Sequence, residues 1–155
     1  MRLTDEFTIT QAPDRAFAFL LDLQNVAACV PGGQVDGPDA DGVYPGRVTV
    51  KLGPMTFRYE GTLRIAERDD ASRTAVIEGA ATASRGAERA RVRSLMEVSP
   101  EGPGSRIRIT TDLEIAGRAA QMGAGIIGVV SRRMVQQAAD CLEARLGAGA
   151  EDAAP

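Results

Sequence analysis

The sequence predicts an α+β domain in which a seven-stranded, curved antiparallel sheet grips one long C-terminal helix, with two short helices closing one end. Two observations predict this fold. Turn-forming residues recur at short intervals between residues 34 and 116, and an apolar stripe with helical spacing follows from residue 118. Short connections favour an antiparallel meander. A sheet with one apolar face must cover that face, and the terminal helix is the only expected element long enough to cover it.

The first 33 residues are expected to form one strand and two short helices. Apolar and polar residues alternate over residues 3–9, with Asp5 as the polar exception on the apolar side. Pro13 suits the first turn of a helix, where its missing N–H is not needed. A second short helix is expected from Asp22, and the Pro31-Gly32-Gly33 turn ends it.

Five turn signals divide the next segment into six expected strands. Alternation is clear in the strand that begins at Met55, where Phe57 and Tyr59 point the same way as Met55 and charged or polar residues point the other way. Such strands belong to a sheet with one face toward solvent. The turn signals lie at residues 38–42, 53–54, 68–73, 85–86 and 100–104.

The long helix is expected over residues 118–146, which at 1.5 Å per residue gives a length of about 40 Å. The residues after it are small or polar, so we expect residues 147–155 to be a flexible C-terminal tail. The predicted organisation is therefore a single domain over residues 1–146, followed by that tail.

Composition excludes several kinds of site. The chain has no histidine, which excludes a histidine-based catalytic triad or zinc site, and we expect no metal site. A formal net charge of -3 gives no reason to expect a nucleic-acid partner. With no leader and no apolar run of about 20 residues, we expect a cytoplasmic protein. Cys29 and Cys141 are too few for a disulfide framework, and we expect both as buried core residues.

The charged residues offer little for catalysis. Arg89, Arg91 and Arg93 share one face of a strand, and we interpret them as a solvated face paired with acidic residues such as Glu78 or Glu97. No pair of carboxylates combines an apolar pocket with a raised pKa, as acid–base catalysis requires. We therefore predict no catalytic residues.

Three glycines near the start of the long helix are unusual. Gly123-x-Gly125-x-x-Gly128 has the spacing of a dinucleotide-binding motif, but it lies within the expected helix rather than at a strand-to-helix turn. Glycine in a helix costs about 1 kcal/mol relative to alanine. It permits tight packing on the short helices, a deformable lip over a cavity, or a docking face for a protein or membrane. The partner or membrane face would consist of Met122, Ile126 and Val129.

Several sequence blocks together resemble the family of the CoxG subunit of carbon monoxide dehydrogenase. That family belongs to the START-like, helix-grip superfamily, also called SRPBCC, and the resemblance covers about residues 3–146. The blocks are Cys29-Val30-Pro31-Gly32, Gly46-x-Val48-x-Val50-Lys51-Leu52-Gly53-Pro54, Tyr59-x-Gly61-Thr62 and Gly117-Arg118-x-Ala120-Gln121-Met122-Gly123-x-Gly125-x-Ile127 with Val130-Ser131.

The resemblance implies a hydrophobic cavity between sheet and helix and no catalytic residues. It also implies an accessory role at the inner membrane face, beside a molybdenum-containing carbon monoxide dehydrogenase or a related hydroxylase, with a quinone or lipid as ligand. No covalent cofactor is implied. Residues 147–155 lack the apolar anchor that some family members carry at this end.

Two functions follow from the residues and the resemblance. The first is non-enzymatic binding of a hydrophobic ligand, with the Tyr59 hydroxyl orienting a carbonyl group. The alternative is a cyclase or hydrolase that uses Asp5 or Glu78 with Tyr59, which requires a carboxylate in the cavity. The expected ligand-binding residues are Met55, Phe57, Tyr59, Met96, Ile127, Val130 and Met134.

Overall fold

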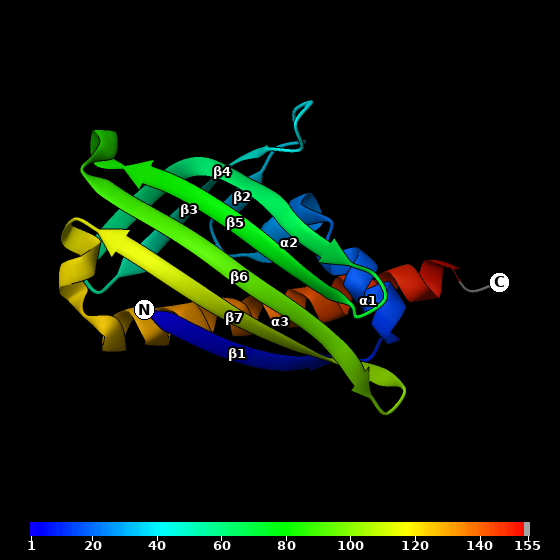
Figure 1. Cartoon of the computed structure of the whole chain (residues 1–155). Helices are drawn as coiled ribbons and strands as arrows, with labels where there is room; N and C mark the ends of the chain where they lie inside the picture. The colour runs from blue at the N-terminus through cyan, green and yellow to red at the C-terminus, as the bar shows by residue number, and fades with distance from the viewer. Residues whose placement is uncertain (154–155) are drawn as a thin grey trace.

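The computed structural model describes the backbone of residues 1–153 and the side chains of residues 1–147. Its seven strands form one antiparallel sheet in the order β1-β7-β6-β5-β4-β3-β2. The sheet curves around the helix α3, as Figure 1 shows. The elements are β1 (Arg2–Ile9), α1 (Pro13–Leu20), α2 (Leu23–Cys29), β2 (Gly33–Val35), β3 (Tyr44–Leu52), β4 (Met55–Asp69), β5 (Thr74–Ala83), β6 (Glu88–Glu101), β7 (Gly104–Ala116) and α3 (Ala124–Ala153), with short 3-10 helices η1 (Ser84–Gly86) and η2 (Arg118–Met122).

The predicted fold class is confirmed, because strands and turns fall where alternation and turn residues place them. Gly53 and Gly102 have positive φ angles of 59° and 56° in two of the turns, a backbone conformation that glycine adopts without strain. Pro13 begins α1. The side chain of Asp22 caps α2 by accepting a hydrogen bond from the backbone N–H of Asn25.

Two groups of buried side chains fill the two ends of the space between sheet and helices. The first group joins α1 and the later turns of α3 to β6 and β7, around the fully buried Ile107. The second lies under η2, where Phe57 and Leu52 pack around Ala119. Between the two groups the core is not filled by side chains.

The terminal helix differs from the prediction at both of its ends. Gly123 has a φ of 88°, which interrupts the helix, so residues 118–122 form the separate turn η2 and α3 begins at Ala124. At the other end α3 runs to Ala153 and takes in most of residues 147–155, for which a tail was expected. Residues 154–155 lie outside the described residues, and the domain limit at residue 146 stays a prediction.

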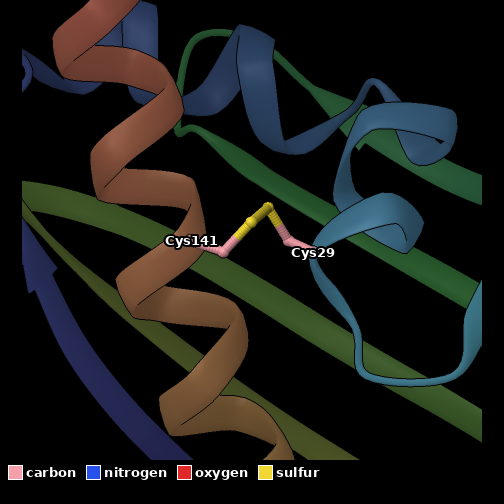
Figure 2. The surroundings of a disulfide bond; sticks show 2 residues. All are labelled: Cys29 and Cys141. Atoms are coloured by element: carbon pink, nitrogen blue, oxygen red, sulfur yellow. A yellow bond between two sulfur atoms is a disulfide. The ribbon is translucent and has the colours of Figure 1, made fainter.

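The two cysteines form a disulfide, which the sequence did not lead us to expect. Cys29 at the end of α2 and Cys141 in α3 are bonded, with 5.4 Å between their Cα atoms (Figure 2). The expectation of two unpaired core cysteines was therefore wrong. Because they lie 112 residues apart, only the packing of α2 against α3 brings them together.

A hydrophobic cavity between the sheet and the long helix

A cavity of about 560 Å³ lies between the curved sheet and the helices α2 and α3. Small residues on the inward face of the sheet make this space, among them Gly61 and Gly79. Gly79 lies between Leu63 and Val92, and a Cβ atom there would come within 2.6 Å of the Leu63 Cδ2 atom. The wall is therefore built from residues too small to fill the gap between a bent sheet and a straight helix.

Five of the seven predicted ligand-binding residues line this cavity. Tyr59 and Met96 lie on the sheet wall, and Ile127, Val130 and Met134 project from α3. The wall around them consists mainly of aliphatic side chains. This is the composition of sites that bind apolar small molecules.

Met55 and Phe57 do not line the cavity, so their prediction as ligand contacts was wrong. Phe57 is only 2% exposed and packs with Leu52, Tyr59 and Ala119, while Met55 packs against the same group. The reason is η2, which covers the end of the sheet where an uninterrupted helix was expected to leave these side chains open.

A second set of cavity residues was not predicted from the sequence. They come from α2 and the loop after it, from β3, and from the inward positions of β6 and β7. The alternation already used for β4 would have found the strand members, whereas only the packing of α2 places the helical ones. The main members of this set are Leu23, Val26, Val30, Val48, Val50, Val92, Ile109 and Leu113.

The Tyr59 hydroxyl is the distinctive polar group of this site. Tyr59 is buried and its hydroxyl oxygen has no hydrogen-bond partner among the described residues. Burial raises the pKa of this hydroxyl, and the negative charge of Glu88 raises it further, so the group is a protonated donor at neutral pH. A buried hydroxyl without a partner is rare in proteins and needs an explanation.

Glu88 fixes the 3-10 helix that closes the cavity end beside Tyr59. Its carboxylate is 1% exposed and accepts hydrogen bonds from the backbone N–H groups of Arg118 and Ala119, at 2.9 and 3.2 Å. Nε of Arg118 donates a third bond at 3.3 Å. The bond from the Arg118 N–H is the main cause of a lowered pKa for Glu88. The carboxylate thus acts as a charged cap for η2.

The carboxylates named for an enzymatic alternative lie away from the cavity lining. Glu78 accepts hydrogen bonds from Arg93 at 2.8 Å and Arg64 at 3.4 Å, on strand positions that alternate with the cavity-facing ones. The interpretation of Arg93 as a surface cation paired with Glu78 is therefore confirmed. Asp5 is half-buried on β1 and is not among the residues that line the cavity.

The predicted partner face is only partly formed. Ile126 is 42% exposed and Val129 54% exposed on the first turns of α3, but Met122 is half-buried and packs with the group under η2. At Gly125 and Gly128 a Cβ atom would meet no other atom within 4 Å. These glycines therefore do not serve tight packing on the short helices, which leaves the lip and the docking face as explanations for them.

Among the described residues no helix is long and apolar enough to cross a membrane. The family model for the CoxG subunit of carbon monoxide dehydrogenase matches residues 6–147. No curated protein matches the sequence.

Solved structures share the fold at low sequence identity. A conserved protein from Geobacillus kaustophilus superposes with a TM-score of 0.83 at 10% identity, over 95% of each chain. The ZhuI aromatase/cyclase from Streptomyces sp. R1128 gives 0.65 at 13% identity, over 94% of this chain and 92% of that one. A START superfamily protein from Mycobacterium smegmatis gives 0.61 at 11%, over 93% and 95%.

Proposed function

The chain belongs to the CoxG family of carbon monoxide dehydrogenase subunits, and from that premise we propose that it is a non-enzymatic protein that binds a quinone- or lipid-like ligand. It would serve as an accessory to a molybdenum-containing carbon monoxide dehydrogenase-type hydroxylase, in the cytoplasm and peripherally at the inner membrane face. Its helix-grip fold supports ligand binding in the cavity between sheet and helix. No cofactor beyond the bound ligand is part of the proposal.

The observation that carries the proposal is the unpartnered Tyr59 hydroxyl in an otherwise aliphatic wall. An apolar ligand with a carbonyl oxygen would bury its hydrocarbon in the cavity and accept a hydrogen bond from Tyr59. The pairing of Glu78 with arginines outside the cavity supports binding rather than catalysis.

The first experiment identifies the ligand. Native mass spectrometry of gently purified protein is expected to show a bound lipid or quinone. Protein stripped of ligand is then titrated with a benzoquinone that carries a decyl chain, and with decylbenzene for comparison. An empty protein that binds neither compound would contradict the proposal.

Tyr59→Phe tests the role of the hydroxyl. Leaving a buried hydrogen-bonding group unpaired costs about 1–3 kcal/mol, so the ligand-free variant should be at least as stable as the wild type. Affinity for the decyl quinone should fall roughly tenfold, equivalent to about 1.4 kcal/mol, while affinity for decylbenzene stays the same. Isothermal calorimetry and thermal melts give both values.

Tyr44→Phe is the matched control, because Tyr44 carries the other tyrosine hydroxyl and does not line the cavity. It should change neither affinity. An unchanged quinone affinity in Tyr59→Phe, or an equal loss for both compounds, would contradict hydrogen bonding by Tyr59.

The accessory role is proposed to use the exposed apolar side chains of Ile126 and Val129. Ile126→Glu should abolish capture of the hydroxylase in a pull-down while leaving the melting temperature nearly unchanged, because the side chain is largely in solvent. Leu95→Glu, at an exposed leucine on β6, is the control and should leave capture intact. Normal capture by Ile126→Glu would contradict this face, and binding to lipid vesicles alone would point to a membrane instead.

A further inference from the structure

A pair of hydroxyl groups lies on the sheet wall of the cavity. Ser94 on β6 and Thr111 on β7 are direct cross-strand neighbours, and their side-chain oxygens are 2.7 Å apart. Both residues line the cavity. The preceding and following inward positions on the two strands are apolar, namely Val92 and Met96 on β6, and Ile109 and Leu113 on β7.

A count of donors shows that this pair does not satisfy itself. Each hydroxyl has one hydrogen to donate and two acceptor sites. The bond between Ser94 and Thr111 uses one of the two hydrogens, and neither side chain has another hydrogen-bond partner among the described residues. One O–H donor and unused acceptor sites therefore remain beside the cavity, whichever residue donates.

Packing gives no reason for hydroxyls at these positions. Every other inward neighbour is aliphatic or methionine, and aliphatic β-branched residues suit strands better than serine. A hydroxyl moved from water to an apolar site without full hydrogen bonding costs about 1–3 kcal/mol in proteins. A polar group presented to a ligand accounts for the pair.

The pair lies far from the Tyr59 hydroxyl along the sheet. The strand registers place Tyr59 of β4 level with Ala83 of β5 and with Glu88 of β6. Ser94 follows Glu88 by six residues on the same strand, which at about 3.3 Å per residue is roughly 20 Å. Tyr59 belongs to the group under η2, whereas Met96, next to the pair, belongs to the group at the other end.

We propose that Ser94 and Thr111 form a second polar subsite, so that the cavity takes a long apolar molecule with two separated oxygen functions, one at this pair and one at Tyr59. A single ring cannot reach both subsites. This inference rests on the proposed function, and it adds the length of the ligand and the placement of its polar groups.

The test uses two alcohols of equal length, hexadecanol with one terminal hydroxyl and hexadecanediol with a hydroxyl at each end. Both are measured by displacement of the apolar fluorophore N-phenyl-1-naphthylamine. Wild-type protein should bind the diol about tenfold more tightly than hexadecanol. The double variant Ser94→Ala with Thr111→Val should lose that preference. Both hydroxyls are removed together because either one alone would still offer a donor.

Two controls separate hydrogen bonding from packing. Thr111→Ser keeps both hydroxyls and should keep the preference for the diol. The matched double variant Ser99→Ala with Thr8→Val removes the same groups from exposed positions of β6 and β1 and should also keep it.

The outcomes distinguish this inference from the proposed function. If wild-type protein binds both alcohols equally, or if the Ser94/Thr111 double variant keeps the preference, the second subsite is wrong while ligand binding stands. If neither alcohol displaces the fluorophore from wild-type protein, both proposals are wrong.

Discussion

Loss of the Cys29–Cys141 disulfide is expected to lower the free energy of unfolding by about 4–5 kcal/mol. The bond closes a loop of 112 residues, and the entropy that a cross-link removes from the unfolded chain grows with loop length. Urea unfolding of wild-type protein with and without a phosphine reductant gives the difference. This loss is large relative to the roughly 5–15 kcal/mol that usually stabilises a domain.

The double variant Cys29→Ser with Cys141→Ser provides the control. It should unfold at the same urea concentration with and without the reductant, close to that of the reduced wild type. Equal midpoints for oxidised and reduced wild type would show that the bond adds no stability, and thiol labelling of the native protein would show whether it had formed.

Phe57→Ala is expected to cost about 3–5 kcal/mol, because it removes a fully buried ring under η2. The ring also stacks near that of Tyr59, with 6.1 Å between centroids, so packing around the ligand donor is weakened as well. Chemical unfolding gives the stability and calorimetry with the decyl quinone gives the affinity.

Met134→Ala is the comparison for Phe57→Ala. Met134 lines the cavity and is only half-buried, so its truncation should cost clearly less stability while changing ligand affinity directly. Equal stability losses in the two variants would contradict the assignment of Phe57 to the core and of Met134 to the cavity wall.

The sheet could be predicted from the sequence because its signals are local. Alternation along residues 55–65 places apolar side chains on one face, and turn residues such as Gly53 mark where each strand ends. Tyr59 and Met96 were identified as cavity residues for the same reason, since a strand residue's face follows from its position alone.

What could not be predicted depends on contacts between distant parts of the chain. Phe57 was misplaced because its environment is set by η2, which exists because Gly123 interrupts the helix and Glu88 binds the turn from another strand. The Cys29–Cys141 pairing depends likewise on where α2 packs along α3. Neither arrangement leaves a periodic pattern in the sequence.

The disulfide has a topological consequence for the cavity. The covalent ring that it closes contains six of the seven described strands, β2 to β7, whereas β1 and α1 precede Cys29 and lie outside the ring. β1 is also an edge strand, paired only with β7, and its Leu3 and Phe7 form part of the cavity wall. The N-terminal strand is therefore the part of the wall that can separate from its neighbour without straining the cross-linked remainder.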